Sequence, residues 1–267
     1  MEISKKNKRT VAIVWTAGIL VVWEVLAFAL QNIFQLPSAG TKLPYLHVVL
    51  ITIVQNWQSL LTDGLITLSR AAAGFLIGSL VGIVLALLMS LSKIVEKVAF
   101  PYLIISQMIP VLGLAPIIFN IVRDMNASRI IIAAYITFFP VAVNMLSGLK
   151  SVEQGKKELL YSIAANKFNV YYKLMIPASL SYLFTGLKIT APMAVTASIL
   201  VDMLGSSSGI GVKILYSLYS SNTNVFWAAV TTSAIMGILS YYAVILAENL
   251  LLPWKKTTAV SKEGGAA

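Results

Sequence analysis

The chain has 267 residues, of which 58% are hydrophobic and only 11% are charged, and its formal net charge is +10. A soluble domain carries about 25% charged residues, so this composition excludes an ordinary soluble protein. Several apolar runs approach the roughly 20 residues that a helix needs to cross a bilayer. We therefore predict an all-α, polytopic membrane protein with about six transmembrane helices that form one unit.

The first apolar run, residues 11–30, follows a short basic segment, residues 1–10. It is too long for the core of a signal peptide, so we expect it to be retained as a membrane helix. Glu24 lies inside this run, and we expect it to reach the interface or a partner on another helix rather than to bind a solute. Beyond it, residues 46–61 predict an amphipathic helix along the membrane surface. This helix contains His47, the only histidine, which we interpret as a polar anchor.

The second predicted span, residues 65–91, contains Gly74, Gly78 and Gly82 at intervals of four. Small residues at this spacing allow two helix backbones to approach closely. The alternative is a membrane helix that merely tolerates glycine.

The third predicted span, residues 98–122, is interrupted by prolines, and the fifth, residues 178–201, has a polar face. Proline removes a backbone donor, and broken backbone at membrane depth is tolerated where it is buried in protein or lines a cavity. We therefore expect both helices to line a pathway, although simple kinks remain an alternative for the third. The residues that we expect to face a central cavity are Gln107, Pro110, Gly113, Thr196 and Ser198.

Two further spans are predicted at residues 130–149 and 225–252. Between the last two spans lies a segment rich in glycine and serine, irregular at residues 206–211 and followed by a short helix at residues 212–218. The final residues, 253–267, form a tail that we expect to be cytoplasmic.

Basic side chains are distributed unequally between the two sides of the predicted spans. Fourteen of the 20 fall on one side and four on the other, and Arg70 and Lys188 lie within spans. Because positive charge is retained in the cytoplasm, both termini are predicted to be cytoplasmic, and this arrangement argues against a nucleic acid partner. The fourteen are Lys5, Lys6, Lys8, Arg9, Lys93, Lys97, Lys150, Lys156, Lys157, Lys167, Lys173, Lys255, Lys256 and Lys262, and the four are Lys42, Arg123, Arg129 and Lys213.

The longest polar interval, residues 158–177, reads ELLYSIAANKFNVYYKLMIP. Apolar residues recur on one helical face, which predicts a short amphipathic helix at residues 158–171 on one side of the membrane. Such a helix lies on lipid or inserts into a partner, and the alternative is a solvated connecting loop. The residues of this face are Leu160, Ile163, Ala164, Phe168 and Tyr171.

This interval resembles the coupling-helix signature of bacterial ABC importer permeases, which is Glu-Ala-Ala, three residues, Gly and a closing Leu-Pro. Glu158 falls on the glutamate, Ala164 on the glycine and Ile176-Pro177 on the closing pair, while Leu159 and Leu160 replace the two alanines. The order of the other motifs resembles the subfamily that imports nitrate, sulfonates, taurine, and thiamine or riboflavin precursors. These motifs are Leu36-Pro37-Ser38, Leu68-Ser69-Arg70 with Gly74, Ile109–Pro116, Pro177–Lys188 and Asp202–Gly211.

The resemblance implies the type I importer permease fold and an alternating-access mechanism in the bacterial inner membrane. It implies a second permease chain in a homodimer, two cytoplasmic ABC ATPase subunits that bind ATP and Mg, an external solute-binding protein, and surrounding lipid. Contact with the ATPase would come from a helix that begins at Glu158 and stays helical at Ala164. The implied coupling residues are Glu158, Leu160, Ile163, Ala164, Phe168 and Pro177, and those of the outer gate or binding-protein contact are Asp202, Gly205, Gly209 and Gly211.

The sequence lacks the residue motifs of several catalytic and metal-binding sites. There is no phosphate-binding loop motif, no zinc protease motif and no cysteine, so we expect no enzyme activity, no bound cofactor and no metal site. An ion-coupled secondary transporter remains an alternative, since Glu24, Arg70 and Lys188 could serve it. Only Lys188 is a candidate cation at mid-depth, which favours an uncharged or aromatic vitamin-like solute, such as a riboflavin or thiamine precursor, over nitrate, taurine or another sulfonate.

Overall fold

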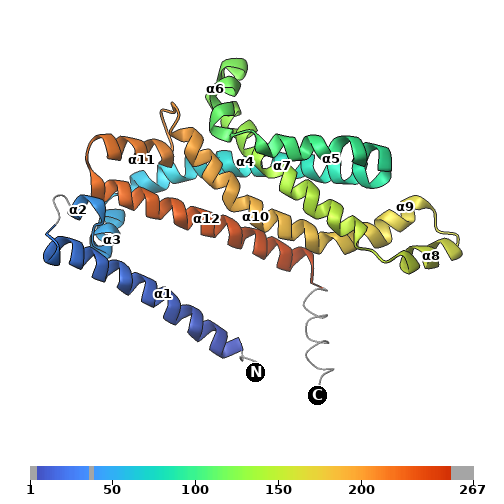
Figure 1. Cartoon of the computed structure of the whole chain (residues 1–267), viewed down its shortest axis with the longest axis horizontal. Coiled ribbons are helices and arrows are strands. Elements are labelled where there is room, and N and C mark those ends of the chain that lie inside the picture. The colour runs from blue at the N-terminus through green and yellow to red at the C-terminus, as the bar shows by residue number, and fades with distance from the viewer. Residues whose placement is uncertain (1–4, 36–38, 254–267) are drawn as a thin grey trace.

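The computed structural model describes residues 5–35 and 39–253, and within these ranges the chain is helical with no strand (Figure 1). This confirms the predicted all-α class. The elements in chain order are α1 (Lys5–Phe28), η1 (Ala29–Ile33), α2 (Ala39–Lys42), α3 (Leu46–Gln55), α4 (Trp57–Leu91), α5 (Lys93–Met108), α6 (Val111–Val122), α7 (Met125–Lys150), α8 (Gln154–Ser162), α9 (Lys167–Val170), η2 (Tyr171–Met175), α10 (Ile176–Asp202), α11 (Ile210–Tyr219) and α12 (Thr223–Leu251).

Five helices in the described ranges are long and apolar enough to cross a membrane, and the bent pair α5 and α6 can supply a sixth span. These positions confirm the predicted set of about six spans. The boundaries differ most at α4, which begins at Trp57 rather than at residue 65, and at α3, which ends at Gln55 rather than at residue 61. Helix α4 is longer because an apolar run marks the part of a helix inside lipid, whereas the helix itself continues into polar sequence. Helix α3 is shorter because the backbone leaves the helical conformation at Asn56, and residues 57–61 belong to α4.

Helices α4 and α7 pack backbone to backbone at the predicted glycine repeat. A Cβ atom added at Gly74, Gly78 or Gly82 would come closer than 3.0 Å to atoms of α7, nearer than real Cβ atoms come. All three glycines are buried. The interpretation of the repeat as a close-approach surface is therefore confirmed.

The chain turns by 98° between α5 and α6, at Ile109 and Pro110. Because proline has no N–H, the carbonyl of Ser106, four residues earlier, loses its helical donor. The hydroxyl of Tyr135 on α7 donates a hydrogen bond to this carbonyl. The bend is thus a defined break whose freed acceptor is satisfied by a neighbouring helix.

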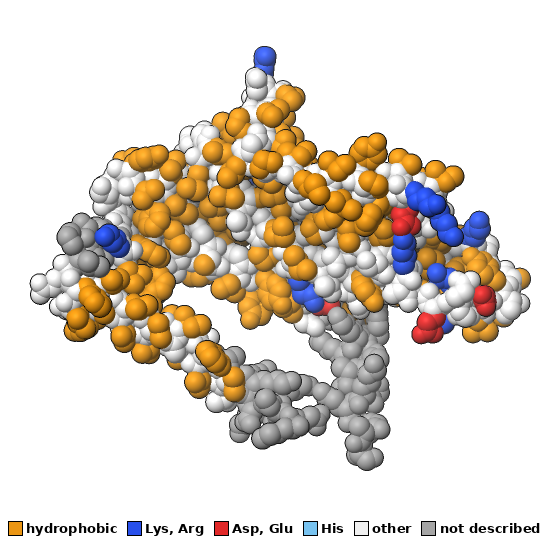
Figure 2. Space-filling view, in the orientation of Figure 1, with side chains coloured by type: hydrophobic (Ala, Val, Ile, Leu, Met, Phe, Trp, Pro, Cys, Tyr) orange, Lys and Arg blue, Asp and Glu red, His pale blue; other side chains and the backbone are white. Residues whose placement is uncertain are grey.

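The helical body has two ends in Figure 1. Helices α8 and α9 form one end, called the α8 end, and α2, α3 and α11 form the opposite one, called the α11 end. Figure 2 shows several Lys and Arg side chains gathered toward the α8 end. Helix α1 lies beside the body, and only 6% of the most apolar stretch within Ile13–Ile33 is buried.

Some predicted features lie outside the described residues. They are residues 1–4, the Leu36-Pro37-Ser38 loop and residues 254–267 of the predicted tail. The rest of the predicted basic segment, from Lys5 onward, already belongs to helix α1.

Candidate functional site

The connection between α7 and α10, residues 153–175, is called the α8 segment. It is not the single predicted helix that begins at Glu158. Helix α8 begins at Gln154, so Glu158 lies in its middle, exposed, and accepts a hydrogen bond from the side chain of Gln154 at 3.1 Å. The favourable charge of a helix start is confined to the first turn and does not act on Glu158, which corrects the predicted role of this carboxylate.

Helix α8 ends at Ser162, so the prediction that the helix continues through Ala164 is wrong. Ala164 has a φ of +61°, in the left-handed region. Its N–H bonds the carbonyl of Tyr161 at 3.0 Å, and the N–H of Ala165 bonds the carbonyl of Leu160 at 3.0 Å. This is the Schellman pattern that closes a helix, and glycine favours it because it has no Cβ. The glycine that the coupling-helix signature has at this position is therefore explained by the left-handed backbone conformation of the turn.

The predicted apolar face of the α8 segment divides into two groups. Leu160 and Tyr171 pack against the core, which includes Val170 and Met175. Ile163 and Phe168 instead point outward with 70% and 73% exposure. Nearby Tyr172, exposed by 65%, stacks on the ring of Phe168 with centroids 6.1 Å apart. The segment thus presents an exposed apolar surface, made of Ile163, Phe168 and Tyr172, at the α8 end.

Two polar contacts fix the return from α8 into α10. The side chain of Asn166 accepts a hydrogen bond from the N–H of Asn169 at 2.8 Å and so caps α9. The hydroxyl of Tyr171 donates to the carbonyl of Ser90, near the end of α4, at 2.8 Å. Pro177 then occupies the exposed first turn of α10, directly after the π-helical turn η2.

At the α11 end, Asp202 is the centre of a buried ionic cluster. Its carboxylate lies 3.2 Å from Nε of Arg129 on α7 and 3.5 Å from Nη1 of Arg70 on α4. Asp202 is 1% exposed and Arg129 is 2% exposed. Asp202 is therefore not at an outer surface, and Arg129 is not in an outer loop. Asp202 and Arg129 differ from their predicted positions for the same reason: a buried charge needs a partner of opposite sign, and each provides it for the other.

The segment after Asp202 wraps around the cluster. Thr67 donates to Oδ2 of Asp202 at 2.5 Å and accepts from the N–H of Ile210 at 2.9 Å. Gly209, buried with a φ of +118°, and Gly211 leave no room for a Cβ beside Asp202. Among the four predicted outer contacts, Gly205 alone is exposed.

The five predicted pathway residues do not share one surface. Gln107, Pro110 and Gly113 are exposed around the bend between α5 and α6, and Thr196 is exposed on α10. Ser198 is 0% exposed, so its predicted place on a cavity wall is wrong. Residues two apart on a helix point about 200° apart, which explains why Thr196 and Ser198 separate.

Two further charged residues of the predicted spans have partners on other helices. Nζ of Lys188 on α10 lies 2.9 Å from the carboxylate of Glu248 on α12. Glu24 accepts a hydrogen bond from the N–H of Leu46 at 2.8 Å and pairs with His47 at 2.6 Å. The expectation that Glu24 finds a partner on another helix is thus confirmed.

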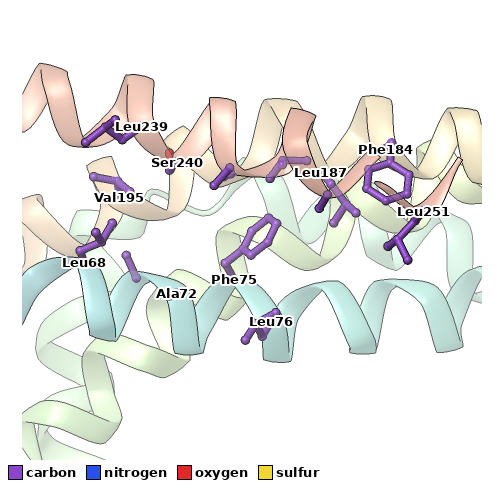
Figure 3. A pocket seen from close by; sticks show the side chains of 15 residues that line it. Leu68, Ala72, Phe75, Leu76, Phe184, Leu187, Val195, Leu239, Ser240 and Leu251 are labelled. Carbon is purple, nitrogen blue, oxygen red and sulfur yellow. The ribbon is translucent and has the colours of Figure 1, made fainter. Parts of the chain in front are cut away.

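A cavity of about 570 Å³ lies between α4, α10 and α12 (Figure 3). Its walls are apolar, with Phe75 and Phe184 as the largest side chains and Ser240 as the one hydroxyl. The Ser240 hydroxyl donates to the carbonyl of Gly237. The lining therefore holds no charged group that could orient a charged solute.

Comparisons with known proteins agree with this architecture. Residues 78–254 match the family described as binding-protein-dependent transport system inner membrane component. The formylaminopyrimidine transport permease protein ThiX of Halalkalibacterium halodurans is 32% identical over 89% of this chain and 93% of its own length. The putative aliphatic sulfonates transport permease protein SsuC of Bacillus subtilis is 28% identical over 78% of this chain and 77% of its own.

A crystal structure of an amino acid ABC transporter with histidines has the same fold, with a TM-score of 0.60 and 18% identity. The match covers 74% of this chain and 97% of the other. The matches decide against the alternative of an ion-coupled secondary transporter. The chain belongs to the family of binding-protein-dependent transport system inner membrane components and is a multi-pass permease subunit of an ABC importer.

Proposed function

We propose that this permease imports a small, uncharged nitrogen heterocycle, such as a pyrimidine precursor of thiamine. One observation carries the choice of an uncharged solute: Lys188, the one cation predicted at mid-depth, is paired with Glu248 at 2.9 Å. Arg70 and Arg129 are likewise held by Asp202. A fixed nitrate or sulfonate site would need a cation available to the solute. The similarity to a formylaminopyrimidine permease supports the same solute class.

The proposed assembly contains two copies of this chain, two cytoplasmic ATPase subunits that bind ATP and Mg, and an external solute-binding protein. It lies in the bacterial cell membrane with both termini in the cytoplasm. The exposed apolar surface of Ile163, Phe168 and Tyr172 docks on the ATPase. Closure of the ATPases then moves the α8 segment, and the permease pair alternates between inward and outward openings.

Uptake by the reconstituted complex tests the solute class. The permease, its ATPase and its binding protein are placed in liposomes containing ATP, and uptake of a labelled aminopyrimidine is measured. An excess of unlabelled aminopyrimidine should abolish uptake, while equal excesses of taurine and nitrate should not. ATP-dependent uptake of taurine or nitrate in place of the pyrimidine would overturn the proposal.

Docking through the exposed apolar surface is tested by replacing Phe168 with Ala in the same complex. Truncating a buried aromatic anchor typically costs about 2 kcal/mol or more of binding energy, so the ATPase should dissociate or lose its response to loaded binding protein. The matched control is Leu250→Ala on α12, where Leu250 is 72% exposed. This variant should keep the ATPase bound and keep its response to loaded binding protein. Full activity of the Phe168 variant would show that this surface is not the docking site.

A further inference from the structure

The hydroxyl of Thr67 joins three parts of the α11 end. Thr67 lies on α4 and is fully buried. Its Oγ1 lies 2.5 Å from Oδ2 of Asp202, the last residue of α10, and 2.9 Å from the backbone nitrogen of Ile210, the first residue of α11. A hydroxyl has one proton to donate, and the carboxylate is both nearer and more strongly accepting than the Asp63 carbonyl at 3.2 Å. Thr67 therefore donates to Asp202 and accepts from Ile210.

The geometry around this hydroxyl leaves little freedom. A Cβ at Gly209 would come closer than 3.0 Å to Asp202 and to Oγ1 of Thr67. The guanidinium of Arg70 donates to the Ser208 hydroxyl at 3.1 Å and to the Ser208 carbonyl at 3.3 Å. The segment between α10 and α11 is thus packed onto the cluster, so a displacement of Asp202 is passed on to it rather than absorbed.

The same two helices connect this cluster to the opposite end of the molecule. Helix α7 enters the α8 segment and α10 leaves it, and their other ends are held together by Arg129 and Asp202 at 3.2 Å. The α8 segment is therefore joined directly to both helices, whose far ends are joined by the ion pair.

We propose that Thr67 is a positioning residue that carries the movement of α10 to residues 203–209 and to α11. Exposed Gly205 and Ser207 would then move when the ATPases close, so that the outer loop follows the nucleotide state. This proposal rests on the proposed function, in which the α8 segment receives the movement of the ATPases.

The experiment compares Thr67→Val, which keeps the shape and removes the hydroxyl, with Thr67→Ser, which keeps the hydroxyl. Each is placed in the full reconstituted complex with Ser207→Cys, the only cysteine in the permease. Two readouts are taken: ATP hydrolysis with and without loaded binding protein, and the maleimide labelling rate at position 207 with and without trapped ATP.

In the parent and Thr67→Ser complexes, trapped ATP should change the labelling rate, and loaded binding protein should stimulate hydrolysis. In Thr67→Val, the labelling rate should be the same in both states. Stimulation should fall about tenfold, as expected for a lost hydrogen bond to a charged group, while basal hydrolysis is unchanged. A Thr67→Val complex that matches Thr67→Ser in both readouts overturns the proposal.

Two further outcomes are possible: the Thr67→Val complex fails to assemble, or the parent complex does not respond to loaded binding protein. If Thr67→Val does not assemble, Thr67→Ala is measured in its place, because it also removes the hydroxyl that bonds Asp202 and Ile210. A loss of both responses relative to Thr67→Ser then supports the inference, and no loss overturns it. If the parent complex itself is not stimulated by loaded binding protein, the proposed function fails, whereas stimulation of the parent and Thr67→Val alike defeats only the role of Thr67.

Discussion

Gly78 of α4 lies directly against the backbone of Ala134 on α7. A Cβ at Gly78 would come closer than 3.0 Å to the carbonyl oxygen and the Cα atom of Ala134. Because those are backbone atoms, a clash there cannot be relieved by rotating a side chain. The pair fixes the distance between the two helices that make the most extensive contact in the described chain.

Gly78→Ala should therefore destabilise the permease. The expected loss is about 1–3 kcal/mol, the usual cost of overpacking, and it would appear as a lower thermal transition in detergent. Gly237→Ala on α12 is the control, because nothing lies within 4 Å of the added Cβ. Equal effects of the two substitutions would contradict the close packing of α4 on α7.

Ala164→Gly should stabilise the end of α8. The left-handed conformation costs an L-residue roughly 1–2 kcal/mol that glycine avoids, so the variant should slow hydrogen exchange at the turn and retain full transport. Ala164→Val should do the opposite, because a β-branched residue is least compatible with this conformation. As a control in the same helix, Gly155→Ala adds a Cβ into open space and should stabilise α8 by about 0.5–1 kcal/mol. Faster exchange in Ala164→Gly would refute the Schellman assignment.

Lys188→Met should lower stability more than the double variant Lys188→Met with Glu248→Met. Breaking a buried pair removes the opposite charge nearest to the remaining partner and costs about 3–5 kcal/mol, whereas replacing both partners with apolar residues is often neutral. Thermal unfolding of both variants in the intact complex measures the difference. Loss of uptake in a well-folded double variant would instead indicate that Lys188 contacts the solute.

The predicted orientation can be read by labelling, because the chain has no cysteine. Single cysteines replace Ser162, exposed on the α8 segment, and Ser207, exposed at the α11 end. In intact cells an impermeant maleimide should label position 207 and not 162, as the distribution of basic residues requires. A third cysteine at Ser4, outside the described residues, should also be protected. Labelling of position 162 from outside would invert the topology.

Gly113→Leu and Ser198→Ala should have different effects on transport. Gly113 is exposed beside the bend of α5 and α6, so a bulky side chain there should reduce uptake while the complex still assembles. The Ser198 hydroxyl is buried without a hydrogen-bond partner among the residues that the structure describes, so its removal should leave stability equal or higher and uptake unchanged. Normal uptake by Gly113→Leu would place the pathway elsewhere.

Features with a local signature were predictable from the sequence. Spans follow from runs of apolar residues, the α4–α7 contact from three glycines at intervals of four, and an interruption of the third span from its prolines. Only Pro110 breaks the helix, whereas Pro101 and Pro116 lie inside α5 and α6. Each of these depends on residues close together in the chain.

The ionic cluster could not be predicted in this way, because Thr67 and Asp202 are separated by 135 positions and no periodicity relates them. The available signal was charge: Arg70 lies inside a predicted span, and Arg129 and Asp202 lie at the ends of two others, where each needs a partner. The end of α8 was missed for a different reason. Alanine favours helix interiors, and at Ala164 the tertiary structure imposes a conformation that its propensity opposes.

The length of α4 has a consequence for the lipid. Its 35 residues extend over about 52 Å, whereas the hydrocarbon core of a bilayer is about 30 Å thick. Even at a tilt of about 40°, the upper limit found for membrane helices, it would cover about 40 Å along the bilayer normal. The helix is therefore longer than the hydrocarbon core at any tilt in this range, so part of it projects beyond the acyl chains, and the polar residues at its start, near Asp63, are the part suited to water. Helix α4 thus carries its contact with α11 beyond the lipid and into the aqueous layer at the α11 end.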